Sequence, residues 1–235
     1  MRINQNHWLL SRPIAHRGLW GGEIIENSIT AYKKAVEMGY PIEIDLFLTT
    51  DKKLVCFHDD NLKRMTGVDK LIYDCSLEEL LSLRLLDSDE KIPTFEQVKE
   101  LACGKVPLLI ELKNHPQKDF VDIIADSLKD YKGEFAVQSF DPTYILKIKK
   151  IAPQFIRGVL GTECCEKDKN FIIRYILKHM PFNKKIEPDF ISYSHTGLPL
   201  KTKVPVISWT ITDNETATKI KDKCYNIIFE NFIPE

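Results

Sequence analysis

The sequence has few cysteines, and none of them is arranged for a zinc site or a dithiol redox motif. Six cysteines are scattered through 235 residues without a CxxC pair, and this spacing excludes the common motifs of both classes. We therefore expect reduced thiols in a cytoplasmic protein. The six are Cys56, Cys75, Cys103, Cys164, Cys165 and Cys224.

Long apolar runs and an excess of one charge are also absent. No stretch of about 20 apolar residues is available to span a membrane, and residues 1–12 lack the apolar run of a secretion signal. The 33 basic and 34 acidic residues are interspersed, so no basic stripe is present to follow a nucleic acid backbone. The pattern argues against both a membrane span and a nucleic acid partner.

What the sequence does contain is enough apolar material for one sizeable core. Hydrophobic residues make up 43% and charged residues 29% of the chain, which is typical of a globular domain, and no linker divides it. We therefore treat residues 1–235 as a single domain.

Short apolar segments alternate with longer segments of helical periodicity, a pattern typical of repeated βα units around a parallel sheet. Eight strands are predicted, at 13–16, 42–48, 106–112, 135–138, 156–159, 190–193, 204–209 and 226–229. Six helices are predicted, at 28–38, 94–102, 118–131, 142–151, 167–179 and 214–223. Asp141 before Pro142, and Thr94 with Gln97, provide the expected helix caps.

Two segments depart from a regular repeat. Residues 49–93 are too long for one loop and include an extra extended run at 54–58, so we interpret them as an insertion. Residues 195–203 are too short for a full helix, so we expect a turn or a single helical turn between the sixth and seventh strands.

Carboxylates occupy one face of the second and third strands. Glu43 and Asp45 alternate with apolar residues. Glu111 and Lys113 alternate with apolar residues in the same way near the end of the third strand. Three carboxylates form a hard, oxygen-rich site that suits Mg²⁺ or Ca²⁺ better than Zn²⁺. The alternative is a buried ion network in which the carboxylates only pair with Arg17 and Lys113.

Two histidines follow extended segments and are expected at the same end of the barrel as these acids. His16 and Arg17 follow the first strand, and His58 with Asp59 follows the extra extended run. Imidazoles titrate near neutral pH and can serve as base and acid, while Arg17 and Lys113 can offset phosphoryl charge. The set is typical of a phosphate-handling site.

These motifs occur in the order and approximate spacing of a known family. They are HRG at 16–18, ENS at 26–28, ExD at 43–45, HD at 58–59, ELK at 111–113, QSF at 138–140 and WT at 209–210. No single piece is decisive, but the ordered set covers nearly the whole chain. On this basis the chain resembles a glycerophosphodiester phosphodiesterase.

The resemblance implies an α/β fold, a (β/α)8 TIM barrel with a small inserted subdomain after the second strand and a shortened sixth helical unit. It implies hydrolysis of a small-molecule glycerophosphodiester to glycerol 3-phosphate and an alcohol through a cyclic phosphate. It implies one divalent cation, Mg²⁺ or Ca²⁺, on Glu43, Asp45 and Glu111, with His16 and His58 as the acid–base pair. It also implies substrate contacts by Arg17, Lys113, Glu26, Asn27, Ser139 and Trp209.

Several residues keep a second interpretation. Glu26 and Asn27 are also candidates to cap the helix that begins near Ser28, and Trp209 is also a candidate for core packing. Gln138 and His195 are further candidates for the pocket wall. His7, His115 and His179 are interpreted as surface or loop histidines.

The end of the chain departs from the family pattern. Phe229 and Glu230 stand where Thr and Asp are usual, so the mouth of the pocket is expected to differ. Two other functions remain open: a lipid phosphodiesterase such as a lysophospholipase D, which needs an exposed apolar rim, and a non-catalytic phosphate-binding barrel. Residues 61–91 are rich in charge and do not indicate such a rim, and both histidines argue against a non-catalytic barrel.

Overall fold

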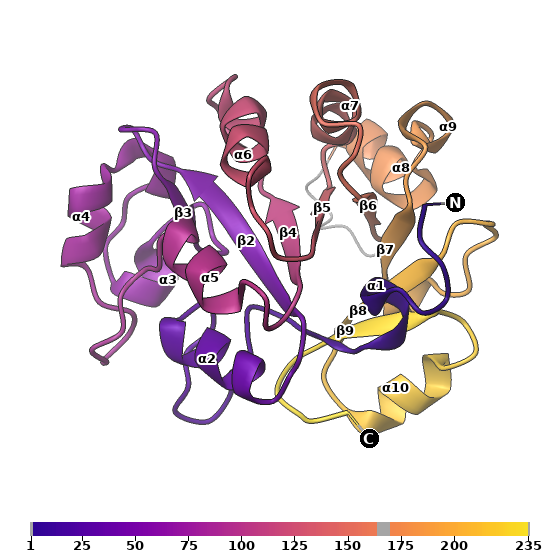
Figure 1. Ribbon diagram of the computed structural model, residues 1–235, viewed down its shortest axis with the longest axis horizontal. Coiled ribbons are helices and arrows are strands. Elements are labelled where there is room, and N and C mark those ends of the chain that lie inside the picture. The colour runs from indigo at the N-terminus through magenta and orange to yellow at the C-terminus, as the bar shows by residue number, and fades with distance from the viewer. Residues whose placement is uncertain (1, 164–169, 235) are drawn as a thin grey trace.

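Eight parallel strands form a closed barrel in the computed structural model, which describes residues 2–163 and 170–234 (Figure 1). β1 pairs with both β2 and β9, and this double pairing closes the sheet. The predicted (β/α)8 barrel is therefore confirmed. The barrel strands are β1 (Ile14–Ala15), β2 (Ile42–Leu48), β4 (Leu108–Leu112), β5 (Phe135–Ser139), β6 (Arg157–Gly161), β7 (Phe190–Ser194), β8 (Val206–Ile211) and β9 (Asn226–Phe229).

Four of these strands begin later than predicted, β6 by a single residue, and proline is the reason for the other three. The predicted ranges at 13–16, 106–112 and 204–209 include Pro13, Pro107 and Pro205, and each observed strand begins at the residue after its proline. A proline has no backbone N–H and cannot donate to the ladder. Their carbonyls do take part, because Pro107 accepts from Ile42 and Pro205 from Ile191.

Helices cover the outside of the barrel where the periodicity predicts them (Figure 1). Thr94 and Gln97 form the expected capping box, and Asp141 caps the helix that starts with Pro142. The range predicted at 167–179 begins at Phe171, and residues 167–169 lie outside the described residues. The helices at predicted positions are α2 (Ile29–Glu37), α5 (Phe95–Ala102), α6 (Phe120–Leu128), α7 (Pro142–Ile151), α8 (Phe171–His179) and α10 (Asn214–Ile220).

The insertion after β2 forms a small lobe with its own core. β3 (Leu54–Cys56) pairs antiparallel with β2, and the remainder contains α3 (Lys63–Thr66), η1 (Ile72–Asp74) and α4 (Leu77–Ser82). Buried side chains such as Phe57, Met65 and Leu80 pack together there. The sixth unit is indeed shortened, since only the 3₁₀ turn η2 (His195–Gly197) stands between β7 and β8.

The amino end of the barrel interior is filled with apolar side chains. Inward-facing residues such as Ile14, Leu109 and Phe190 pack against Trp8 and Leu9 of the short helix α1 (Trp8–Ser11). This packing leaves the carboxyl end for polar side chains, which is where barrels of this class place their chemistry. The short helix α9 (Asn183–Ile186) lies between α8 and β7 in the chain.

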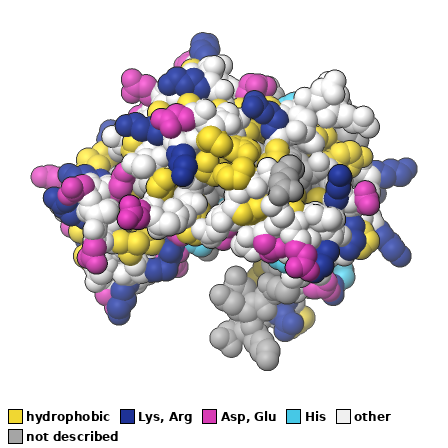
Figure 2. Space-filling view, turned by 90° about the horizontal axis from the view of Figure 1, so that it is seen from below, with side chains coloured by type: hydrophobic (Ala, Val, Ile, Leu, Met, Phe, Trp, Pro, Cys, Tyr) yellow, Lys and Arg dark blue, Asp and Glu magenta, His cyan; other side chains and the backbone are white. Residues whose placement is uncertain are grey.

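Two surface properties bear on partners. On the face seen in Figure 2, basic and acidic side chains are interspersed rather than gathered by sign. Within the part of the chain that the structure describes, no helix is both long enough and apolar enough to cross a bilayer.

Candidate active site

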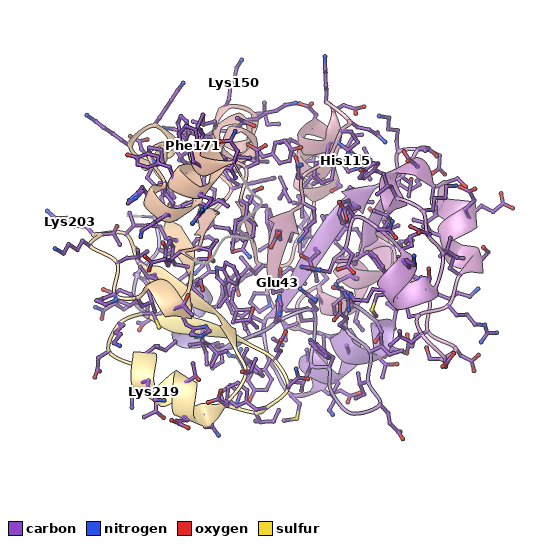
Figure 3. The ribbon with its side chains drawn as sticks, turned by 180° about the vertical axis from the view of Figure 1, so that it is seen from behind. Glu43, His115, Lys150, Phe171, Lys203 and Lys219 are labelled. Atoms are coloured by element: carbon purple, nitrogen blue, oxygen red, sulfur yellow. The ribbon has the colours of Figure 1, made fainter. Side chains whose placement is uncertain are left out.

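Polar side chains from six strands or strand ends converge on the carboxyl end of the barrel. Glu43 lies at the centre of the molecule among the strands (Figure 3). The side chains surround a small central cavity of about 90 Å³. Its lining consists of His16, Arg17, Glu43, His58, Glu111, Lys113, Gln138, Phe140, Leu160, Trp209, Thr210 and Ile228.

The three predicted metal ligands meet in this cavity or directly beside it. Asp45 and Glu111 are register partners on adjacent strands, and one oxygen from each of Glu43, Asp45 and Glu111 lies within 4.8 Å of the others. All three side chains are buried. Among the described residues, Asp45 Oδ1 receives no hydrogen bond, and a buried oxygen left in this state suits a cation ligand. The donor set therefore fits one hard divalent cation.

The same carboxylates also pair with the two predicted phosphate-binding cations. Lys113 Nζ lies 3.1 Å from Glu111 Oε1 and 3.4 Å from Asp45 Oδ1. Arg17 Nε lies 3.6 Å from Asp45 Oδ2, and the Arg17 backbone N–H donates to Glu43 Oε2 at 3.1 Å. Arg17 and Lys113 therefore offset part of the buried negative charge of the cluster. The ion network and the metal cluster are thus the same set of residues.

The network gives the two strand-β2 carboxyls opposite pKa shifts. Burial, together with Asp45 and Glu111, raises the pKa of Glu43 well above its ordinary value. Burial opposes ionisation of Asp45 as well, but Lys113, His58 and Arg17 outweigh it and lower the pKa of Asp45. Of these two carboxyls, Glu43 is therefore the one that keeps its proton to higher pH.

His16 is held by a carboxylate at the far end of the chain. Its Nδ1 lies 2.5 Å from Glu230 Oε2, and its Nε2 faces the acidic cluster, 3.9 Å from Glu43 Oε2. The HRG turn depends on Gly18, which has a φ of +85° and would place an added Cβ 2.9 Å from the backbone of Ala31. Glu230 was singled out in the sequence only as a departure from the family pattern.

His58 has a matching arrangement supplied by the insertion. Its Nδ1 lies 2.6 Å from Asp59 Oδ1, and Arg64 of α3 donates to Asp59 Oδ2 at 2.6 Å. Arg64 also donates to Glu26, and these contacts lower the pKa of Asp59, although burial opposes the shift. Arg64 was not predicted, because nothing in its local sequence indicates contact with a motif 38 residues earlier.

Glu26 and Asn27 of the ENS motif support the site and do not cap α2. Ser28 caps α2. Asn27 Nδ2 donates to Asp45 Oδ2 at 3.2 Å and its Oδ1 accepts from Tyr32, so Asn27 orients a cluster carboxylate. Glu26 accepts from Arg17 Nη1 at 2.9 Å.

The remaining candidates take different places. Trp209 borders the cavity and meets Phe140 edge-on, with ring centroids 5.5 Å apart. Gln138 borders it too and accepts from Ser192. Ser139 donates to the Leu112 carbonyl, and neither Ser139 nor His195 is among the residues that line the central cavity.

His115 lies in the loop after β4, as the loop interpretation predicts, but it is not a surface histidine. It is buried, its Nε2 lies 2.9 Å from the Leu48 carbonyl, and its ring stacks on Phe120. It also helps to line a larger cavity of about 460 Å³ that adjoins the site through His58 and Lys113. The other lining residues are Phe47, Asp59, Asp60, Tyr73, Asn114 and Pro116.

Comparisons with known proteins agree with this geometry. A candidate glycerophosphodiester phosphodiesterase from Bacillus subtilis is 29% identical over 229 residues, covering 88% of this chain and 89% of that one. Lysophospholipase D from Rattus norvegicus is 33% identical over 138 residues, covering 53% of this chain and 43% of that one. A phosphodiesterase from Oleispira antarctica, solved with the product sn-glycerol-3-phosphate, has a TM-score of 0.78 at 23% identity over 94% of this chain and 93% of that one.

A family model accounts for most of the sequence and includes every predicted site residue. The match runs from residue 16 to residue 222, from His16 of the HRG turn to beyond Trp209. This chain belongs to the glycerophosphoryl diester phosphodiesterase family.

Proposed function

We propose that the protein hydrolyses glycerophosphodiesters to glycerol 3-phosphate and an alcohol. The observation that carries the proposal is the pairing of two imidazoles, each held at Nδ1 by a carboxylate, beside three clustered carboxylates and two cations. A site that only bound phosphate would need the cations but not two oriented imidazoles. The small-molecule product in the Oleispira antarctica structure supports the same class of substrate.

Glu43, Asp45 and Glu111 would hold one divalent cation, Mg²⁺ or Ca²⁺. When bound, such an ion stabilises negative charge that develops on phosphoryl oxygens. Arg17 and Lys113 border the same cavity and would bind the remaining phosphoryl oxygens. Trp209 would pack against the glycerol carbons, because its ring forms part of the cavity wall.

His16 and His58 would exchange protons with the substrate in two steps. In the first, one imidazole takes the proton of the glycerol hydroxyl next to the phosphate as that oxygen attacks phosphorus. The bond from phosphorus to the alcohol breaks, and the other imidazole donates a proton to the departing oxygen. In the second, water opens the cyclic phosphate while the two imidazoles exchange roles. Asp59 and Glu230 hold each Nδ1, which leaves each Nε2 for this work.

The test is hydrolysis of glycerophosphocholine and glycerophosphoethanolamine, followed as release of glycerol 3-phosphate with and without EDTA. Chelation should abolish release, and added Mg²⁺ or Ca²⁺ should restore it. Activity indifferent to chelation would remove the cation from the mechanism. The absence of release from both substrates by folded, metal-supplied protein would reject the proposed substrate class.

Histidine variants test the acid–base roles. We expect His16→Ala and His58→Ala each to lower turnover by roughly 10²-fold or more. His179→Ala, which removes an exposed histidine from α8, is the matched control and should retain full turnover. Near-normal turnover in either active-site variant would contradict its assigned role.

A lysophospholipid is a second candidate substrate. The Rattus norvegicus relative is named a lysophospholipase D, and the cavity of about 460 Å³ beside His58 and Lys113 offers room for a larger alcohol. Release of choline from lysophosphatidylcholine would support this candidate.

We also infer a cytoplasmic location, because Cys56, Cys75, Cys103 and Cys224 are free thiols.

A further inference from the structure

Exposed apolar side chains concentrate on one short part of the surface. Eleven large apolar residues of the described chain are exposed, and five of them fall between residues 171 and 182. We call these five the α8 patch: Phe171, Ile172, Ile173, Tyr175 and Phe182. Phe171 is 77% exposed and lies on an outer helix, away from Glu43 at the centre (Figure 3).

The apolar side chains of α8 are mostly exposed, which is the reverse of what is expected for an outer barrel helix. Such a helix buries one apolar stripe and turns polar residues to water. Here Leu177 is the one buried residue of α8, yet Phe171, Ile172 and Tyr175 lie on the opposite, exposed side. Tyr175 contacts His179 on that side, with ring centroids 4.7 Å apart and the ring planes tilted by 43°.

The position of α8 explains why the barrel does not cover this face. Its last turn is tied to the carboxyl ends of β6 and β7, because Leu177 O accepts from the Thr162 N–H at 3.0 Å and Lys178 O accepts from the Tyr193 hydroxyl at 3.1 Å. Phe171 lies about 9 Å further along the helix axis. Leu160 of β6 borders the central cavity, so α8 is attached at the same rim as the active site.

Basic residues outnumber acidic ones in this segment. Residues 170–187 contain the four cations Arg174, Lys178, Lys184 and Lys185 and one carboxylate, Glu187, and therefore carry a net charge of +3, whereas the whole chain carries −1. Phenylalanine and tyrosine beside basic residues are typical of helices that lie in the interface of a bilayer. An anionic lipid surface offers an apolar interior to the exposed apolar side chains and negative head groups to the basic residues. A charged, hydrophilic protein surface would match only the basic residues.

We propose that the α8 patch docks the protein on an anionic lipid surface, with the catalytic rim near that surface. The apolar side chains insert among the lipids, and Arg174, which lies on α8 among them, contacts the head groups. This docking does not depend on the proposed hydrolysis, because it uses none of the residues of the active site.

The first test is co-sedimentation of the full chain with vesicles of phosphatidylcholine and phosphatidylglycerol, 3:1, in EDTA. We expect wild-type protein to sediment with these vesicles, to bind pure phosphatidylcholine vesicles more weakly, and to be released by high salt. The double variant Phe171→Ser, Tyr175→Ser should lower the partition coefficient at least about tenfold. Arg174→Gln should lower it by about fivefold.

Tyr225→Ser is the matched control, because Tyr225 and Tyr175 are each 57% exposed but Tyr225 lies outside the patch. Equal loss in the control and the patch variants, or no sedimentation of wild-type protein, would overturn the proposal. A concentration-dependent dimer in analytical ultracentrifugation that the double variant abolishes, without vesicle binding, would instead assign the patch to a second copy. Hydrolysis of soluble glycerophosphocholine should be unchanged in the double variant, which separates docking from catalysis.

Discussion

Glu230 shows how one residue outside the family motifs completes the site. It follows β9 and contacts His16, 214 positions away in the sequence. A carboxylate at Nδ1 fixes the orientation and tautomer of an imidazole and stabilises its protonated form. Asp59 does the same for His58, so the two histidines are supported by different parts of the fold.

We expect Glu230→Ala to lower kcat by about 10- to 100-fold, with KM changed much less, because the variant loses the orientation of His16 but no contact to substrate. Steady-state kinetics on glycerophosphocholine would measure the split. Glu230→Asp should recover part of the loss, and Glu215→Ala, which removes an exposed carboxylate of α10, should change neither constant. A wild-type kcat in Glu230→Ala would rule out the positioning role.

Cation binding should release a proton from Glu43. Burial, with Asp45 and Glu111 close by, raises the pKa of Glu43 above its ordinary 4.5. In the metal-free protein Glu43 therefore keeps its proton as the pH rises past 4.5 and loses it only near the raised pKa. Affinity for Mg²⁺ or Ca²⁺ should therefore increase with pH across that interval. Calorimetry in two buffers of different ionisation enthalpy measures the proton released, and identical heats in both would contradict the assignment.

Among the elements, the helices depend on local signals and the strands on their register. The capping box at Thr94 and Gln97 lies in four consecutive residues and forms as predicted. Strand alternation places Glu43, Asp45 and Glu111 on one side. The starts of three strands depend on one more local rule, because each of these strands begins at the residue after a proline that its predicted range included.

We expect Thr94→Ala to lower the free energy of unfolding by about 1 kcal/mol, because the first turn of α5 loses the side-chain acceptor for the Gln97 N–H. Urea unfolding would measure the change. Thr218→Ala, at an exposed position of α10, is the control and should unfold near the wild-type midpoint. Equal loss in both variants would assign the effect to threonine removal in general.

At the scale of the molecule, the cation would link the two parts of the barrel that provide its ligands. β2 and β4 carry the three carboxylates, and a metal ion bound to the folded state would relieve the repulsion that remains beside Arg17 and Lys113. Excess cation should therefore stabilise the whole domain by mass action.

A cation at about 100 times its Kd should raise Tm by roughly 5–10 °C in a domain of this size. Thermal unfolding with and without Mg²⁺ or Ca²⁺ measures the shift. Asp45→Asn, which keeps the shape of a proposed ligand but removes its charge, should lose most of it. A shift of the same size in that variant would place the ion elsewhere.

The sequence by itself determined the barrel, the insertion and the identity of the central residues. Periodicity, caps and strand alternation are local properties, and the ordered motifs identify the family. The tertiary structure alone decided which side chains meet: Glu230 with His16, Arg64 with Asp59, and His115 against the Leu48 carbonyl. It also decided that the apolar side of α8 faces outward, because attachment of that helix at the rim leaves no barrel wall to cover it. Such contacts depend on barrel closure and on how the insertion folds over the site, which no local pattern specifies.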